Sequence, residues 1–268
     1  MLNVSGHVSS RSDPWTFGGM PALVAHRGFA RRFPENTLVS LAAAVDAGAA
    51  YVEFDLQLSK DQVPFLMHDD NFRRTSGCEQ SVFDLNIAAI QDLCVGEPER
   101  LGGRFQHVRP ITLRSLCHHL NAWPSVHPFI EVKRHSVQHF GLQTAMARIK
   151  TALLDLHIPF TLISFRQDVV EYAQQNGIDS TGWVLRDWNA ESLDILHKLA
   201  PQFVFCNYKK IPHAIDLPHG PWAWVLYEIT DGQTASKWRD RGAHMIESMA
   251  VSSMLNAPPF AVTQEHNS

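Results

Sequence analysis

The sequence predicts an α/β protein built as a closed (β/α)8 barrel, the TIM-barrel architecture, on three observations. Short β-rich runs alternate along the chain with amphipathic helical stretches, a pattern typical of a parallel sheet. The β-rich runs number eight, which is the strand count of such a barrel. The 268 residues are 45% hydrophobic, enough for one large core in a single domain spanning 1–268. An open doubly wound sheet would show much the same alternation, so periodicity alone leaves both architectures open.

The eight β-rich runs set the expected order of strands. Each run is short, apolar and rich in β-branched or aromatic residues, and turn-forming segments bound it. The first helix is expected over residues 37–47, because Leu38, Leu41 and Val45 share one face and Gly48 ends the pattern. The expected strands are 22–26, 51–58, 128–133, 161–165, 180–185, 202–206, 222–228 and 244–247.

Three segments lie outside this alternation. Residues 1–20 are polar and rich in Ser and Gly, and we expect an N-terminal arm; residues 256–268 are expected to form a loose tail. Residues 69–111, after the second strand, are too long for a simple connection, so we expect a small insertion with a helical run at 86–94. We expect this insertion to cover the mouth of the barrel and shape access to it, with an inert surface decoration as the alternative.

The charge balance and the cysteines limit the classes of function that the sequence allows. The formal net charge is -4, so no basic field would gather nucleic acid or an anionic membrane. Cys78, Cys94, Cys117 and Cys206 contain no Cys-x-x-Cys pair, and we expect them to be reduced and mostly buried. The N-terminus lacks the basic start and apolar segment of a signal peptide, and no segment approaches the roughly 18 apolar residues of a membrane span. A cytoplasmic protein without stable membrane anchoring is expected, and the sequence leaves the oligomeric state open.

Carboxylates gather at two of the expected strands. Residues two apart in a strand share a face, so Glu53 and Asp55 point to one side, and Glu131 and Lys133 do the same on the next strand. Burying like charges together without a cation is unfavourable by several kcal/mol for each charge. A bound metal ion explains the arrangement, and oxygen ligands suit a hard divalent ion such as Mg²⁺ or Ca²⁺ better than Zn²⁺.

Two histidines complete the expected site. His26 ends the first strand, and His68 follows the apolar run at 63–67. Cleavage of a phosphodiester needs one group that takes a proton from the nucleophile and another that gives one to the leaving alkoxide, and two histidines can do both near neutral pH. Arg27 and Lys133 can stabilise charge on the phosphoryl oxygens. Three carboxylates, a divalent ion, these two cations and a phosphodiester monoanion sum to zero charge.

Five short motifs with these residues follow one another in a fixed order. With these motifs in this order, the sequence resembles the glycerophosphodiester phosphodiesterase family. The resemblance implies a TIM barrel, a divalent metal ion held by Glu53, Asp55 and Glu131, catalytic His26 and His68, and phosphate contacts from Arg27 and Lys133. It continues through residues 74–77, 110–113 and 164–165. The five motifs are His26-Arg27-Gly28, Pro34-Glu35-Asn36-Thr37, Glu53-x-Asp55, His68-Asp69 and Glu131-x-Lys133.

The sequence departs from the family pattern near its end. Residues 224–227 read Trp-Val-Leu-Tyr where the family usually has Trp-Thr-Val-Asn, and Ile246-Glu247-Ser248 stands where Thr-Asp is usual. The contacts to the alcohol are therefore expected to differ from the family norm. We expect Trp224 to form an apolar wall for the glycerol or head group, with a core aromatic as the alternative. Glu228 and Asp231 are expected at the rim of the site.

The expected function is metal-dependent hydrolysis of small-molecule glycerophosphodiesters to glycerol 3-phosphate and an alcohol, with Mg²⁺, Ca²⁺ or Mn²⁺ as the ion. Two alternatives stay open. A lysophospholipase D-type activity would use the same site but needs an apolar groove, which residues 69–111 do not obviously supply. A barrel that only binds phosphorylated ligands would have no use for two proton-transfer groups.

Overall fold

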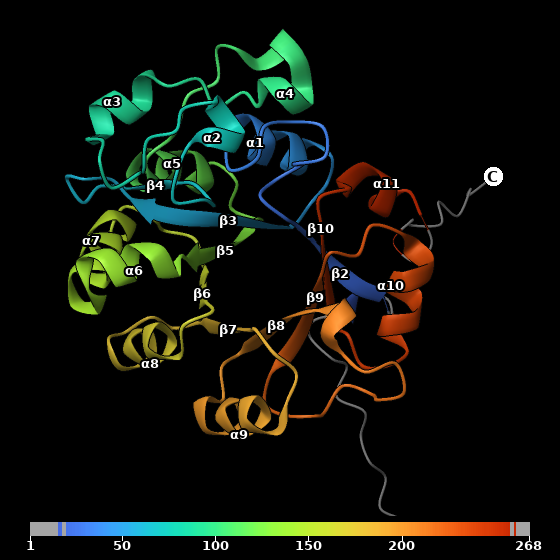
Figure 1. Cartoon of the computed structure of the whole chain (residues 1–268). Coiled ribbons are helices and arrows are strands. Elements are labelled where there is room, and N and C mark those ends of the chain that lie inside the picture. The colour runs from blue at the N-terminus through green and yellow to red at the C-terminus, as the bar shows by residue number, and fades with distance from the viewer. Residues whose placement is uncertain (1–15, 18–19, 258–259, 261–268) are drawn as a thin grey trace, which may run out of the picture.

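A ring of eight parallel strands forms the centre of the molecule in the computed structural model, which describes residues 16–17, 20–257 and 260 (Figure 1). The ring closes because β10 pairs with β2, with Glu247 opposite Val24, and β2 pairs in turn with β3. This closure confirms the (β/α)8 barrel over the open sheet, and all eight expected strands are found. They are β2 (Met20–Ala25), β3 (Tyr51–Leu58), β5 (His127–Val132), β6 (Thr161–Ser164), β7 (Thr181–Leu185), β8 (Phe203–Asn207), β9 (Ala223–Tyr227) and β10 (Met245–Ser248).

Helices surround this ring. The expected first helix is α1, and it begins at Leu38 because the Thr37 hydroxyl accepts a hydrogen bond from the Ser40 backbone N–H. The Thr112 hydroxyl accepts from the Ser115 N–H in the same way at the start of α5. The helices outside the insertion are α1 (Leu38–Asp46), α5 (Leu113–Asn121), α6 (Arg134–Phe140), α7 (Leu142–Leu153), α8 (Gln167–Gln175), α9 (Ala190–Leu199), α10 (Gly232–Arg239) and α11 (Val251–Leu255).

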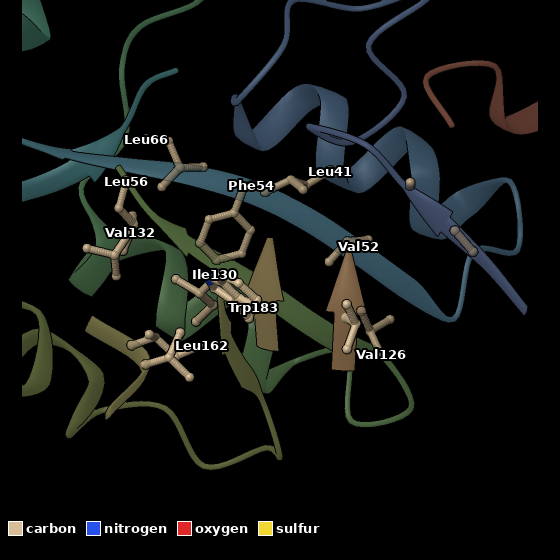
Figure 2. Packing of buried hydrophobic residues seen from close by; sticks show 14 of the residues in the cluster. Leu41, Val52, Phe54, Leu56, Leu66, Val126, Ile130, Val132, Leu162 and Trp183 are labelled. Atoms are coloured by element: carbon tan, nitrogen blue, oxygen red, sulfur yellow. The ribbon is translucent and has the colours of Figure 1, made fainter. Parts of the chain in front are cut away.

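The strands alternate between an outer and an inner face. On β3, Val52, Phe54 and Leu56 point outward into the main core between strands and helices (Figure 2). The inner faces fill the ring with a second apolar cluster, so the amino-terminal half of the barrel is a packed core. This inner cluster comprises Ala22, Val24, Phe129, Ile163, Val184, Phe203, Phe205, Ala223, Val225 and Met245.

Several short helices form the insertion at 69–111, and one further strand precedes it. β4 (Pro64–Leu66), which the sequence did not predict, pairs antiparallel with β3. The expected helical run is present as α3 (Ile87–Asp92), accompanied by α2 (Arg73–Ser76), α4 (Pro98–Leu101) and a 3-10 turn, η1 (Gly102–Phe105). A small core that includes Phe65, Phe72 and Ile90 holds the segment together. In Figure 1 it lies beside α1 and α5, to one side of the ring of strands.

The ends of the chain and the cysteines can be compared with expectation only in part. Within the expected arm, β1 (Thr16–Phe17) pairs antiparallel with β2, whereas residues 1–15 and 18–19 lie outside the described residues. Most of the expected tail, 258–259 and 261–268, lies outside them too.

All four cysteines are free; Cys117 and Cys206 are buried and the other two half-buried. None of the helices in the described part of the chain combines the length and apolar character that crossing a bilayer requires.

Candidate active site

The carboxyl-terminal ends of the barrel strands meet in a pocket of about 100 Å³. This is the end of the barrel at which enzymes with this fold carry their active sites. The pocket is lined by six of the residues singled out in the sequence, and Asp55 lies fully buried beside them. Those six residues are His26, Arg27, Glu53, His68, Glu131 and Lys133.

Asp55 has the most polar contacts of the three expected metal ligands. The Asn36 side-chain amide donates to its Oδ2 over 2.8 Å, and the Asn36 Oδ1 accepts from the Asp55 backbone N–H at 2.9 Å. Lys133 Nζ donates to the other oxygen at 3.2 Å. Burial opposes ionisation of Asp55, but Lys133 and Arg27 outweigh it and hold the pKa of Asp55 well below its usual range. Asp55 is therefore a fixed negative charge.

Arg27 is held by a sharp turn at the end of β2. Its φ of 54° is left-handed, and its backbone N–H donates to Glu53 Oε2 at 3.0 Å. The next residue, Gly28, also has a positive φ, and a Cβ there would lie 2.6 Å from the Ser40 backbone of α1. The turn thus packs on α1 and aims the guanidinium inward, with Nε 3.2 Å from Asp55 Oδ2.

Glu131 and Lys133 lie where strand alternation predicts them, at the end of β5. Their side chains form an ion pair, with Lys133 Nζ 2.7 Å from Glu131 Oε1. Burial alone would lower the pKa of Lys133, but Asp55 and Glu131 outweigh it and raise that pKa. Lys133 therefore stays charged, and it contacts two of the three expected metal ligands.

His26 has the opposite electrostatic setting. Burial, followed by the positive charge of Arg27, lowers the pKa of His26 well below its usual value. Its Nε2 lies 3.9 Å from Glu53 Oε2, and its Nδ1 is buried without a hydrogen-bond partner. The ring is therefore neutral near pH 7 and keeps a lone pair with which to accept a proton.

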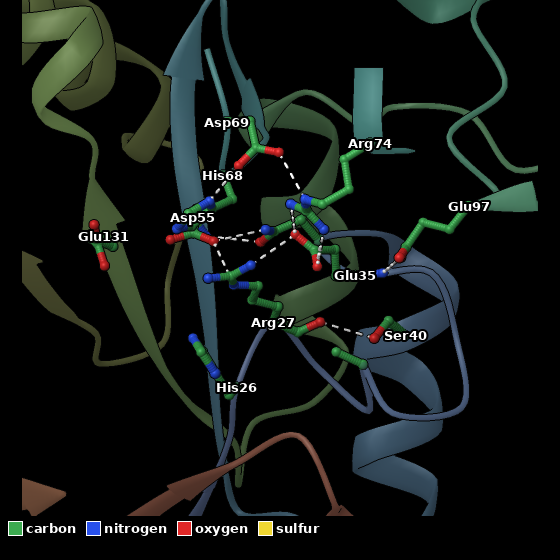
Figure 3. A network of polar contacts seen from close by, with 12 residues as sticks. His26, Arg27, Glu35, Ser40, Asp55, His68, Asp69, Arg74, Glu97 and Glu131 are labelled. Atoms are coloured by element: carbon green, nitrogen blue, oxygen red, sulfur yellow. Dashed lines mark hydrogen bonds and ion pairs between the residues drawn. The ribbon is translucent and has the colours of Figure 1, made fainter. Parts of the chain in front are cut away.

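His68 immediately precedes the insertion and is held in the site by a chain of charged contacts (Figure 3). Its Nδ1 lies 2.7 Å from Asp69 Oδ1, and Arg74 Nε donates to the other Asp69 oxygen at 2.8 Å. Arg74 also makes two 2.7 Å hydrogen bonds to the Glu35 carboxylate, and Arg27 donates to Glu35 at 2.9 Å. Glu35 thus connects the turn after β2 with the segment that positions His68.

Glu35, Arg74 and Glu247 are site residues to which the sequence analysis gave no role. Glu35 and Arg74 are 39 residues apart, and no periodicity in the sequence predicts their contact. Glu247 lines the pocket from β10 and is 3% exposed. A signal for Glu247 was present, because it follows the inward-facing Met245 by two residues at the end of an expected strand.

The structure places Trp224 outside the site, which corrects the expectation that it forms a wall for the substrate. Trp224 faces the outer helices together with Leu226, and its indole N–H donates to the Pro218 carbonyl at 2.9 Å. It is 1% exposed, as the core alternative requires. The aromatic side chains that line the pocket are Phe165, Phe205 and Tyr227, and Glu228 lies at the rim as expected.

Two sets of side chains in the described part of the chain could hold a metal ion. One is the expected set Glu53, Asp55 and Glu131, and the other is His26, Glu53 and Glu247. In each set the ligand atoms lie within 4.8 Å of one another. Oxygen atoms alone make up the first set, which suits a hard divalent ion. Glu53 Oε1, which has no hydrogen-bond partner, offers a free ligand atom for it.

Residues 26–133 match the model of the glycerophosphoryl diester phosphodiesterase family. Over these residues the chain is similar to this family. Glycerophosphodiester phosphodiesterase 1 of Rattus norvegicus is 36% identical over 118 residues, covering 42% of this chain and 34% of the relative. Glycerophosphoinositol inositolphosphodiesterase GDPD2 of Mus musculus is 46% identical over 82 residues, covering 30% of this chain and 15% of the relative. The chain thus spans less than half the length of these curated relatives of the glycerophosphodiester phosphodiesterase family.

Solved structures of phosphodiesterases share the fold of this chain. A phosphodiesterase of Oleispira antarctica, in complex with the product sn-glycerol-3-phosphate, superposes with a TM-score of 0.78 at 20% identity. The match covers 89% of this chain and 97% of that one. A glycerophosphoryl diester phosphodiesterase from Silicibacter pomeroyi, described as putative in its name, gives 0.75 at 16% identity over 88% of this chain and 92% of its own. At these identities the likeness establishes the TIM barrel.

Proposed function

We propose that this protein is a phosphoric diester hydrolase that cleaves glycerophosphodiesters to glycerol 3-phosphate and an alcohol in a metal-dependent reaction. The observation that carries the proposal is the pocket at the carboxyl end of the barrel, where two imidazoles face buried carboxylates, the buried Lys133 and the largely buried Arg27. Similarity of residues 26–133 to the glycerophosphoryl diester phosphodiesterase family supports this class of activity. The sn-glycerol-3-phosphate bound to the Oleispira antarctica phosphodiesterase supports this product.

We assign the metal ion to Glu53, Asp55 and Glu131. The ion, when bound, would stabilise negative charge on the phosphoryl oxygens, and Mg²⁺, Ca²⁺ and Mn²⁺ all suit the all-oxygen set. Lys133 touches two of these carboxylates and also lines the pocket. It is therefore positioned to bind a phosphate oxygen, and Arg27, which has the same charge, also contacts Asp55 and lines the pocket.

The two histidines carry the proton transfers in the proposed reaction. His26 is neutral and acts as the general base, since burial and Arg27 lower its pKa. His68 acts as the general acid, and Asp69 at 2.7 Å from Nδ1 orients the ring. The hydrogen bond from Arg74 to Asp69 attaches the His68–Asp69 pair to the insertion.

The substrate supplies the nucleophile in this scheme. Glycerophosphodiesters carry a hydroxyl on the carbon next to the phosphoester, and its proximity gives it a large effective concentration over bulk water. His26 takes the proton of this hydroxyl, the oxygen attacks phosphorus, and the bond to the alcohol breaks as His68 protonates it. Water then opens the cyclic phosphate with the two roles exchanged. A substrate analogue without that hydroxyl tests this step, because unchanged kcat/KM without a transient cyclic phosphate would replace it by direct attack of water.

Assays of released glycerol 3-phosphate test the proposal as a whole. We expect turnover of glycerophosphocholine, glycerophosphoethanolamine or glycerophosphoglycerol that chelation abolishes and Mg²⁺, Ca²⁺ or Mn²⁺ restores. Lysophosphatidylcholine in the same panel tests the lysophospholipase D alternative. Binding of glycerol phosphate without turnover of any diester would support the non-catalytic barrel instead, and full turnover in metal-free buffer would overturn the metal assignment. The cytoplasmic location and the absence of nucleic-acid partners stay predictions.

A further inference from the structure

Besides Arg27 Nε, which lies 3.2 Å from Asp55 Oδ2, three buried polar atoms in the upper barrel have no hydrogen-bond partner, and they belong to neighbouring side chains. They are His26 Nδ1, Glu53 Oε1 and Glu247 Oε1. The residues come from three adjacent strands of the ring, β3, β2 and β10, and each is at least nine-tenths buried. Unpartnered buried polar atoms are unfavourable, so a cluster of them indicates a site that a ligand completes.

Glu247 is not explained by the proposed hydrolysis. The expected metal set already holds three carboxylates, and Lys133 and Arg27 contact the most buried of them. Glu247 adds another carboxylate on the far side of Glu53, and no basic side chain forms an ion pair with it among the described residues. An unpaired carboxylate buried beside others is costly, and a cation is the group that would offset that cost.

The donor set around Glu247 differs chemically from the first set. His26, Glu53 and Glu247 combine one imidazole nitrogen with two carboxylates, and their ligand atoms lie within 4.8 Å of one another. Nitrogen and carboxylate donors together suit borderline ions such as Zn²⁺ and Co²⁺, whereas Mg²⁺ and Ca²⁺ prefer oxygen alone. The two sets therefore differ in the ion that they select, although they share Glu53.

We propose that His26, Glu53 and Glu247 form a second cation site, selective for Zn²⁺-like ions, whose occupation inhibits the enzyme. Binding of the ion engages an imidazole nitrogen of His26, so the lone pair that accepts the proton is no longer available. The existence of the site stands on the side chains alone, and only its inhibitory effect rests on the proposed function.

Zn²⁺ binding to the Mg²⁺-saturated protein tests the site without any assay of activity. Equilibrium dialysis should find about one Zn²⁺ per chain at a site with this donor set. Glu247→Gln should weaken this binding at least about tenfold, because even residues that only support a metal ligand contribute about 10 to 100-fold. Glu228→Gln is the matched control, since it removes one carboxylate from the rim of the same pocket, and Zn²⁺ affinity should stay within about twofold.

Two binding results would contradict the second cation site. Absence of Zn²⁺ binding in the presence of excess Mg²⁺, or binding that Glu247→Gln leaves unchanged, would overturn the proposal. Unfolding midpoints confirm that each variant is folded. Glu247→Leu, which removes the carboxylate without leaving a buried amide, repeats the test if the glutamine variant is unstable, and the same loss of Zn²⁺ binding is expected.

Inhibition is measured against the Mg²⁺-supported rate of each variant itself. Zn²⁺ should inhibit the wild type, and Glu247→Gln should need at least about tenfold more Zn²⁺ for half inhibition, in line with its weaker binding. Raising Mg²⁺ should not relieve this inhibition. Relief in proportion to Mg²⁺ would place Zn²⁺ in the first metal set and overturn the inhibitory role. Absence of Mg²⁺-supported hydrolysis in the wild type would instead refute the proposed function and leave the binding test standing.

Discussion

The two halves of the barrel interior are made by the same strands and have opposite chemistry. Toward the amino-terminal ends, Phe129 packs edge-on against Phe203 and Phe205 at 5.0 and 5.2 Å between ring centroids. Two residues further along β5, the inward position holds Glu131. The lower half buries apolar surface and stabilises the fold, whereas the upper half buries charges whose benefit comes with a bound ion and substrate. On one strand, inward residues two positions apart thus belong to the apolar core and to the site.

The largest difference between the halves should appear in catalysis. His26→Ala or His68→Ala should each lower kcat by roughly 10² to 10⁴, since proton transfer by a positioned side chain contributes about that much. The unfolding midpoint should change little, because His26 keeps a buried nitrogen without a hydrogen-bond partner and the His68 side chain is 33% exposed. Steady-state kinetics and thermal unfolding measure the two effects. A loss of less than tenfold would remove that histidine from the proposed mechanism.

A core substitution in the lower half should show the reverse pattern. Phe129→Ala should lower the free energy of unfolding by about 3–5 kcal/mol, because it leaves a cavity at a fully buried position between two other rings. The kcat of the fraction that remains folded should stay near that of the wild type. Denaturant unfolding gives the stability, and activity at low temperature gives kcat. Equal losses in both would mean that the halves are not separable.

Strand alternation is local, so the sequence predicts the inward carboxylates of the upper half. Glu53, Asp55 and Glu131 were placed inward by counting residues in twos, and all three line or adjoin the pocket. The same count, applied to the last strand, would have added Glu247. It could not orient Trp224, because both faces of β9 are apolar and nothing in the sequence distinguishes the inner one. Barrel closure and the Glu35 to Arg74 contact join distant segments, and no local pattern encodes them.

The two halves should also respond to acid in opposite directions, beginning with His127 at the start of β5. Burial lowers the pKa of His127 to about 4, so the unfolded chain binds the proton more readily than the folded one. The free energy of unfolding is therefore undiminished above the usual histidine pKa of about 6.5 and falls as pH drops from there toward 4, by at most about 3 kcal/mol. His127→Gln should flatten this decline in urea titrations between pH 7 and 4. An unchanged decline would assign it to other groups.

The smallest effect concerns a carboxylate of the upper half in the metal-free protein. Burial, followed by the charges of Asp55 and Glu247, raises the pKa of Glu53 well above its usual value. Its folded form holds the proton more tightly than the unfolded one, so Glu53 favours folding at low pH and this contribution is lost as pH rises from about 4.5. Glu53→Gln removes the charge, and we expect the free energy of unfolding at pH 8, with chelator present, to rise by about 1 kcal/mol. The gain should shrink near pH 5, where the wild-type carboxyl is protonated, and should reverse in saturating Mg²⁺, because the variant loses a metal ligand. Urea unfolding of both proteins under these three conditions measures the difference in their free energies of unfolding. A variant less stable than the wild type at pH 8 without metal would show that Glu53 stabilises the apo fold, and the division between a stabilising lower half and a costly upper half would then fail.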